Sequence, residues 1–191
     1  MSGALESHID ASVQAIESCR TLLPKIEQAG LMMAAAIAQG GTVAFCGNGG
    51  SAAEAQHLAA ELVGRFRRER AAFAAVALTT DSSILTAIGN DYSFDEVFAR
   101  QVRALLREGD VLVALSTSGN ARNVCRGAEA ARQLGVRVVG LTGRDGGRLA
   151  ELCDVELRVP AEETARVQEA HLLIGHLLCE IIEARLSCEN R

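Results

Sequence analysis

Apolar residues along this chain alternate between short unbroken runs and longer segments of helical character. Five apolar runs predict strands that are covered on both faces of a parallel sheet, and they span residues 42–46, 73–78, 111–115, 136–141 and 155–159. Segments of helical character lie between them, at residues 51–66, 81–88, 94–106 and 121–134. This alternation predicts a three-layer α/β fold, with a doubly wound five-stranded parallel sheet in the order 2-1-3-4-5.

Two helices are predicted before the sheet. Apolar residues recur there at steps of three and four, at Leu5, Ile9, Val13 and Ile16. This amphipathic stripe predicts a helix over residues 4–22 that ends near Pro24, and a second helix covers residues 25–39.

The C-terminal segment predicts a long helix that is apolar on nearly every side. Its apolar residues spread over most of the helical wheel, at Leu172, Leu173, Ile174, Leu177, Leu178, Ile181, Ile182 and Leu186. One sheet face cannot cover such a helix, so we expect it to pack on the sheet and also on another subunit. No linker divides the chain, and we expect one domain over 1–191, with N-terminal helices at about 3–39, a sheet core at about 42–159 and a C-terminal helix at about 164–186.

Composition and charge exclude several classes of protein. With 191 residues, 49% of them hydrophobic, the chain has the length and composition of about one globular domain. A net charge of −5 offers no basic surface for nucleic acid or an anionic membrane. The longest apolar runs have eight residues, far short of the roughly 18 that span a bilayer. The acidic N-terminus differs from a secretory signal, so we expect a cytoplasmic protein.

The cysteines form no paired motif. They are never closer than nine residues apart, which excludes a CxxC redox or zinc pair, and we expect scattered core residues at Cys19, Cys46, Cys125, Cys153, Cys179 and Cys188.

Two loops with phosphate-binding character follow the first and third predicted strands. They are Cys46-Gly-Asn-Gly-Gly-Ser51 and Leu115-Ser-Thr-Ser-Gly-Asn120, and each runs into a helix. Small residues let the backbone approach an anion, which helix-start N–H groups and hydroxyls can hold. The alternatives are a plain strand-to-helix turn and an N-cap cluster. Because strands one and three flank the point where an open sheet binds its ligand, we predict a site for one phosphate with a polar molecule beside it.

Imidazole and carboxylate groups gather on two predicted helices. His57 and Glu61 stand four residues apart and share a helix face, as an ordinary solvated pair also would. Gln168 and His176 lie eight residues apart on the last helix, so they meet one ion only by reaching inward or by coming from different subunits. Together these four side chains form a plausible site for a divalent metal such as zinc. His171 is interpreted as a structural residue or as one that supports the ligands without touching the metal.

At these residues the sequence resembles the phosphoheptose isomerase family, whose members share the sugar isomerase (SIS) domain. The resemblance runs from about residue 5 to 186 and rests on both loops and on the helical group above. It also includes Ala87-Ile-Gly-Asn-Asp91, Leu141-Thr-Gly143, Asp145-Gly-Gly147 and Gln168-Glu169.

The resemblance implies an activity and a site. It implies isomerisation of sedoheptulose 7-phosphate to D-glycero-D-manno-heptose 7-phosphate, the first step of ADP-heptose biosynthesis, in a homotetramer whose active sites lie between subunits. It implies Glu61 as the base of an enediol mechanism and His176 as its acid–base partner. The implied ligands of one Zn²⁺ per subunit are His57, Glu61, Gln168 and His176. The implied substrate contacts are Asn48, Gly49, Gly50, Ser51, Glu61, Asn90, Asp91, Ser116, Thr117, Ser118 and Gln168.

The chain departs from its relatives at two positions. Ala121 stands where several relatives carry a serine, so a backbone N–H or Arg122 is expected to replace that hydroxyl. Ala165 stands where some relatives carry an aspartate. Both changes affect phosphate and sugar contacts rather than the reaction.

Two other functions remain open from the sequence. Related chains of the same fold bind the replication initiator without turning over a sugar, but such adaptors lack the glutamate and final histidine that stand here at Glu61 and His176. An isomerase acting on another sugar phosphate, such as a pentose or aminosugar phosphate, is the second alternative.

The segment Arg65-Phe-Arg-Arg-Glu-Arg70 is interpreted as a solvated basic turn near a helix end, with only Arg65 within reach of a substrate.

Overall fold

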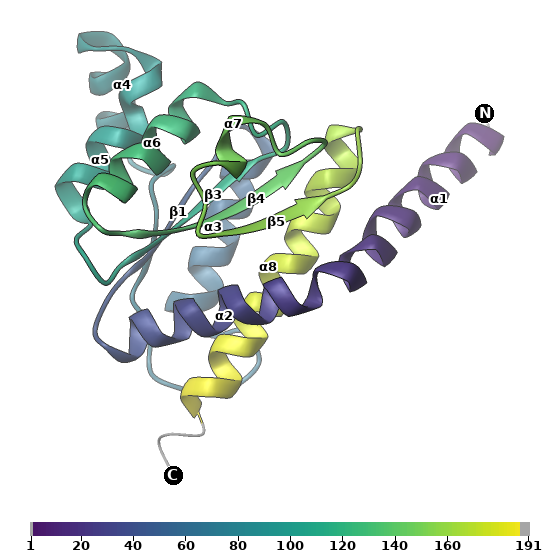
Figure 1. Cartoon of the computed structure of the whole chain (residues 1–191), viewed down its shortest axis with the longest axis horizontal. Coiled ribbons are helices and arrows are strands. Elements are labelled where there is room, and N and C mark those ends of the chain that lie inside the picture. The colour runs from purple at the N-terminus through teal and green to yellow at the C-terminus, as the bar shows by residue number, and fades with distance from the viewer. Residues whose placement is uncertain (1, 188–191) are drawn as a thin grey trace.

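A five-stranded parallel sheet forms the centre of the molecule, in a computed structural model that describes residues 2–187 (Figure 1). The strand order is β2-β1-β3-β4-β5, as predicted. Val43 of β1 pairs with Ala75 of β2 on one side and with Val111 of β3 on the other, so β1 and β3 are neighbours at the centre. The strands are β1 (Val43–Cys46), β2 (Ala75–Ala77), β3 (Val111–Ser116), β4 (Arg137–Gly143) and β5 (Val155–Val159).

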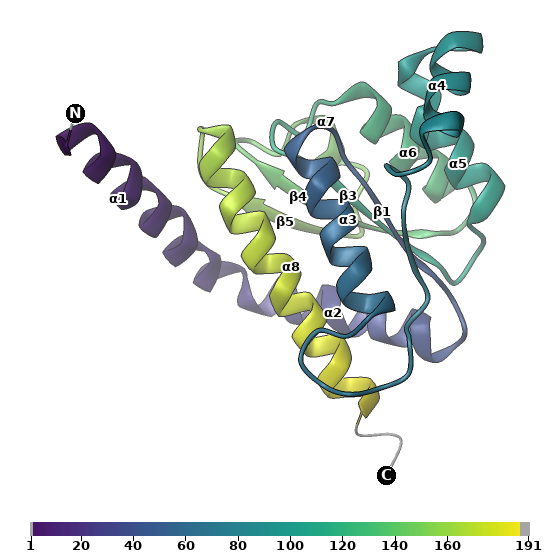
Figure 2. The ribbon, with the colours of Figure 1, turned by 180° about the vertical axis from the view of Figure 1, so that it is seen from behind.

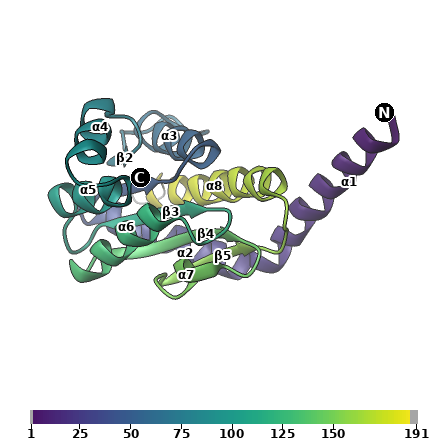
Figure 3. The ribbon, with the colours of Figure 1, turned by 90° about the horizontal axis from the view of Figure 1, so that it is seen from above.

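Helices cover both faces of this sheet. They are α1 (Ser2–Ser18), α2 (Leu23–Ala38), α3 (Gly50–Val63), α4 (Ser82–Asp91), α5 (Val97–Leu105), α6 (Arg122–Gln133), α7 (Gly147–Ala150) and α8 (Thr164–Ser187), with short 3-10 turns η1 (Cys19–Leu22) and η2 (Phe94–Glu96). Alternate strand residues point to opposite faces, so Phe45 and Leu115 pack in the core beneath α2, α3 and α8. Leu112 and Val138 pack in the second core, beneath α5 and α6. Figure 3 shows the resulting three layers.

The first helix extends away from the rest of the chain. In Figures 1 and 2 the N-terminal part of α1 projects from the body. Contact with α8 begins near the middle of α1, where Arg166 donates to the His8 carbonyl at 2.8 Å. The predicted apolar stripe is consequently exposed, from 63% at Leu5 and Ile9 to 41% at Ile16. The helix was predicted correctly, but its end was not: α1 ends at Ser18, and Pro24 lies in the first turn of α2 instead of ending the first helix. One chain alone leaves the stripe uncovered.

The long C-terminal helix is enclosed on several sides by its own chain. α8 packs against α1, α2, α3 and β4, and Ile174, Leu178 and Ile182 are buried. The sequence suggested that another subunit covers part of the apolar surface of α8. In the structure, neighbouring helices of the same chain cover most of it. Leu172, Leu177 and Ile181 remain partly exposed.

Element boundaries differ from the prediction mainly at chain reversals. The predicted strand 73–78 is only three residues long, because residues 64–74 form a loop after α3. Asp81 lies outside α4 and caps it by accepting a hydrogen bond from the Ile84 N–H at 2.8 Å. Asp145-Gly-Gly147 leads directly into the one-turn helix α7, with Gly146 as its N-cap.

The structure also tests the predictions about the cysteines and about membrane-spanning helices. Cys19, Cys46, Cys125 and Cys179 are buried and free, Cys153 is partly buried, and Cys188 lies outside the described residues. Within residues 2–187, no helix has both the length and the apolar character needed to cross a membrane.

Candidate active site

The first glycine-rich loop forms the turn between β1 and α3, where the sequence predicts a phosphate site. Gly49 has φ +56° and is the N-cap of α3, with no side chain to cap the helix. The Ala52 and Ala53 N–H groups donate to the Gly49 carbonyl at 3.0 and 3.2 Å, so the preceding Gly50 and Ser51 N–H groups are the ones that can reach a ligand at the positive end of the helix dipole. Gly50 lies directly under Gln168, because a Cβ at this position would come within 2.8 Å of the Gln168 Cδ. The loop and α8 thus meet at the predicted phosphate site.

The second loop follows β3 and is fixed by a tight turn. The Gly119 N–H donates to the Ser116 carbonyl at 3.0 Å, and Gly119 has φ +66°. A side chain at Gly119 would collide with the backbone of Gly146. Ser116 is buried, whereas Thr117 and Ser118 are partly exposed, so this loop presents hydroxyl groups at the carboxyl end of the sheet.

An amide pair that the sequence analysis missed ties the two loops together. Asn48 and Asn123 exchange two side-chain hydrogen bonds, each 2.8 Å long. Asn123 lies in the first turn of α6 and is buried, and its Oδ1 also accepts the Val124 N–H. Its position three residues after the Ser-Gly-Asn turn was the only sequence signal for it.

Three proposed catalytic and metal-binding side chains converge between α3 and α8. The Nε2 atoms of His57 and His176 are 2.8 Å apart, and His57 Nε2 is 3.4 Å from Glu61 Oε1. A contact of 2.8 Å between two imidazoles requires one ring to donate and the other to accept a proton. The side chain of Glu61 is 21% exposed, so it is partly withdrawn from water.

A missing side chain allows α3 and α8 to approach closely at this point. A Cβ on Gly175 would lie within 2.6 Å of Leu58 Cδ1, and the Leu58 side chain is buried. Gly175 precedes His176, and Leu58 follows His57. The helix contact that requires glycine is therefore the contact that joins the two histidines.

The sequence suggested that the basic segment after α3 is a solvated turn, but part of it is buried. The side chain of Arg70 is only 5% exposed and forms an ion pair with Glu183 of α8 at 3.0 Å. Phe66 in the same segment stacks on His176, with ring centroids 5.3 Å apart and planes at 23°. Arg65 is 61% exposed and lies near Glu69, so its reach toward a substrate stays a prediction.

Two buried ionisable groups lie close to the site. Burial raises the pKa of Glu54 to about 7, although a hydrogen bond from Ser51 opposes the shift. Burial lowers the pKa of His171 to about 4, although its hydrogen bond to the Thr142 carbonyl opposes this. His171 is therefore a structural residue, as expected, whereas Glu54 was not singled out. With a pKa of about 7 this carboxyl is only partly ionised at neutral pH, which reduces charge repulsion toward an anion at the first loop.

The donor set fits a divalent metal. The ligand atoms of His57, Glu61 and His176 all lie within 4.8 Å of one another. Two imidazole nitrogens on a tetrahedral zinc are about 3.3 Å apart, so the histidine rings need to separate by only about half an ångström to admit an ion. Two imidazoles and a carboxylate are ligands that zinc prefers.

The remaining predicted site residues are placed as follows. Asn90 and Asp91 are exposed at the end of α4, where the Asn90 amide donates to Asp91 Oδ1 at 2.8 Å. Ala121 is the N-cap of α6 and provides no side-chain cap. Arg122, the expected substitute for the missing serine, is 81% exposed and pairs with Asp95 at 3.0 Å.

Comparison with known proteins agrees with this geometry. Residues 7–143 match the SIS domain family, and the fold and site accordingly define a SIS-domain protein. The chain is 53% identical over 186 residues to the phosphoheptose isomerase of Rhodospirillum rubrum, covering 95% of this chain and 99% of that protein. The chain belongs to the phosphoheptose isomerase family.

Two solved structures agree along nearly the whole chain. The phosphoheptose isomerase from Neisseria gonorrhoeae matches with a TM-score of 0.91 at 47% identity, covering 96% of this chain and 98% of that one. The enzyme from Francisella tularensis matches with a TM-score of 0.92 at 42% identity, covering 95% and 97%.

Proposed function

We propose that this protein catalyses the isomerisation of sedoheptulose 7-phosphate to D-glycero-D-manno-heptose 7-phosphate, the first step of ADP-heptose biosynthesis. The observation that carries this proposal is the convergence of Glu61 and His176 beside two anion loops, in a chain with close phosphoheptose isomerase relatives. The same pair argues against a non-catalytic adaptor, which has no need of either group. We also propose a cytoplasmic location, where a charged sugar phosphate is retained.

The phosphate is proposed to lie between the two loops. The backbone of Gly49, Gly50 and Ser51 and the first turn of α3 would donate N–H groups, since the dipole of α3 favours an anion there. Hydroxyl groups of the second loop would complete the contacts. The proposed phosphate residues are Asn48, Gly49, Gly50, Ser51, Ser116, Thr117 and Ser118.

The sugar is proposed to extend from the phosphate toward the histidine pair. Gln168 bridges these regions, because it lies over Gly50 and on the same helix as His176. We propose that Gln168 and Glu61 contact the sugar, together with Asn90 and Asp91.

The SIS domain is proposed to take in the whole chain, residues 1–191.

Glu61 is proposed as the base that moves a proton between C1 and C2 of the substrate through a cis-enediol. A carboxylate partly withdrawn from water is a suitable base for this step. His176 is proposed to move protons on the sugar oxygens, and the Phe66 ring limits its rotation. Both side chains project into the same space between α3 and α8.

We propose that Zn²⁺ is held by His57, Glu61, Gln168 and His176. The observation that supports this site is the convergence of the His57, Glu61 and His176 side chains. When bound, the metal would polarise the carbonyl or enediolate oxygen of the substrate.

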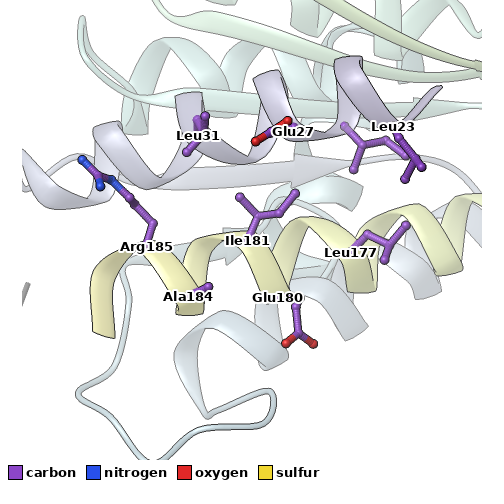
Figure 4. Close-up of a pocket in the computed structure, with 9 residues that line it drawn as sticks. Leu23, Glu27, Leu31, Leu177, Glu180, Ile181, Ala184 and Arg185 are labelled. Carbon is purple, nitrogen blue, oxygen red and sulfur yellow. The ribbon is translucent and has the colours of Figure 1, made fainter. Parts of the chain in front are cut away.

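We also propose a homotetramer with active sites at subunit interfaces. Two surfaces support assembly: the exposed apolar stripe of α1 and an apolar groove of about 560 Å³ between α2 and α8. Figure 4 shows Leu23, Leu31, Leu177 and Ile181 along this groove. Light scattering at micromolar concentration that gives the mass of one chain would refute the assembly.

Conversion of sedoheptulose 7-phosphate, followed by NMR with and without chelator and with zinc restored, tests the function. Heptose 7-phosphate that disappears on chelation and returns with zinc supports both the reaction and the metal. Faster turnover of a C5 or C6 ketose phosphate would instead favour another substrate. No product under any condition, with capture of the initiator protein, would favour the adaptor.

A further inference from the structure

A buried carboxylate on α8 holds the segment that follows α3. The side chain of Glu183 is 1% exposed. It accepts backbone N–H groups from Phe66 at 2.9 Å, Arg67 at 2.9 Å and Arg68 at 3.1 Å, and the Arg70 Nε at 3.0 Å. Four donors thus surround one carboxylate, so its negative charge is fully compensated without water.

Arg70 connects this carboxylate to the end of α3. Its Nη2 donates to the Glu61 carbonyl at 2.8 Å, and its Nη1 donates to the Leu62 and Ala71 carbonyls, each at 2.9 Å. The guanidinium also lies 3.8 Å from the ring centroid of Phe73. Carbonyls in the last turn of a helix lack intrahelical donors, and Arg70 supplies them at the turn that bears Glu61.

Both ends of this network reach the proposed catalytic groups. At one end, Glu183 holds the backbone of Phe66, whose ring stacks on His176. At the other end, Arg70 holds the backbone of Glu61 itself. Among the described residues, no hydrogen bond or ion pair joins Arg70 or Glu183 to the Glu61 carboxylate or to the His57 and His176 rings. Their connections to the proposed site run through Phe66 and the α3 backbone.

Burial of this pair is not needed merely to attach the segment. A second ion pair, between Arg67 and Glu180, joins the same two elements at 2.9 Å, with side chains 68% and 41% exposed. Removing charges from water is costly, and a buried ion pair often stabilises a fold no better than apolar residues of the same shape. What a buried and fully bonded pair supplies beyond stability is a single geometry.

We propose that Arg70 and Glu183 are positioning residues, which fix the His176 ring through Phe66 and fix Glu61 through its own carbonyl. This inference rests on the proposed function, because it assigns the pair to the geometry of that active site.

The matched variants are Glu183→Gln and Glu180→Gln, which remove one charge each from neighbouring turns of α8. In Glu183→Gln the amide NH2 group, itself a donor, replaces an oxygen that accepts hydrogen bonds from the segment after α3. Two donors then face each other, so the segment must shift. Because a displacement of about 1 Å can cost on the order of 100-fold in rate, we expect kcat to fall at least about tenfold with KM within about twofold of wild type. Glu180→Gln should keep both constants within about twofold.

Histidine NMR provides a readout that a purely structural role does not move. The chain has four histidines, so ring signals can be assigned by single substitution. At fixed pH we expect the His176 ring signals to move in Glu183→Gln and in Phe66→Leu, which loses the stacked ring, and to stay in place in Glu180→Gln. The Arg70→Lys variant keeps the charge but not the fork of donors, and should resemble Glu183→Gln.

The outcomes separate this proposal from the proposed function. If Glu183→Gln fails to fold, Phe66→Leu and Arg70→Lys decide by the same measurements. Unmoved His176 signals, with kcat values equal to that of Glu180→Gln, overturn the positioning role. If wild-type protein shows no isomerase activity, the proposed function fails, and the His176 signals alone still decide whether the pair sets that ring.

Discussion

His171 predicts a specific dependence of folding stability on pH. The side chain is fully buried, its Nε2–H donates to the Thr142 carbonyl at 2.9 Å, and its Nδ1 has no hydrogen-bond partner within the described residues. Protonation at Nδ1 would place an uncompensated charge in the core. The pKa of His171 therefore falls to about 4 in the folded protein, from 6.5 for an unperturbed histidine.

This difference favours the unfolded state as the pH falls. Between pH 6.5 and 4 the unfolded chain binds a proton at His171 that the folded chain does not bind, so stability is full above 6.5 and is lost progressively below it. Proton linkage with these two pKa values gives a His171 contribution of about −2 kcal/mol to the free energy of unfolding between pH 7 and pH 5. Other groups such as Glu54 add contributions of their own, so the difference between wild type and a variant without His171 isolates this one.

Urea unfolding at both pH values, at one protein concentration, measures this loss for wild type and for His171→Gln. The glutamine amide can still donate to the Thr142 carbonyl but does not titrate, so the variant should lose about 2 kcal/mol less than wild type on acidification. His8→Gln, at an exposed position, serves as the control and should behave as wild type. The same pH dependence in wild type and His171→Gln would refute the reasoning.

Three further substitutions have defined outcomes. Wild type should lose up to about 3 kcal/mol of stability relative to Glu54→Gln as the pH rises from 4.5 to 7, because the folded chain keeps a proton on Glu54 that the unfolded chain releases. Urea titrations of both proteins at pH 4.5 and 8 would show this difference. Gly175→Ala should cost about 1–3 kcal/mol in urea unfolding and should also lower kcat, since the new Cβ pushes Leu58 and α3 away from α8; unchanged kcat would contradict the packing argument. Glu61→Gln should reduce turnover of sedoheptulose 7-phosphate by at least about 100-fold, and normal turnover would eliminate Glu61 as the base.

The sequence was sufficient for the sheet and for the two loops. Strands such as 111–115 are unbroken apolar runs, and this pattern forces burial on both faces of a parallel sheet. The glycines and hydroxyl residues after β1 and β3 follow directly from those strands, so the anion loops could be located by counting along the chain. Boundaries were less certain at β2, where the apolar run 71–78 includes residues that serve the loop after α3.

The convergence of the candidate catalytic side chains could be predicted only in part. His57 and Glu61 share a helix face through their spacing, but no local pattern shows that His176, 119 residues further along, lies 2.8 Å from His57. That contact depends on Gly175, whose importance arises only when α3 is packed against α8. Asn123 and Glu54 were missed for the same reason, since their roles come from neighbours distant in sequence or from burial.

Arg70 and Glu183 illustrate the limit most clearly. In the sequence Arg70 belongs to a basic segment with the pattern of a solvated turn, and Glu183 is one charged residue in a long apolar helix. Residue type and periodicity report only how each side chain meets its own helix or strand. Burial and partner are properties of two elements packed together, and 113 residues separate this pair. The sequence by itself determined the sheet order, the anion loops and the residue types of the site, whereas the packing of α3 and its following loop on α8 decided which of those residues meet.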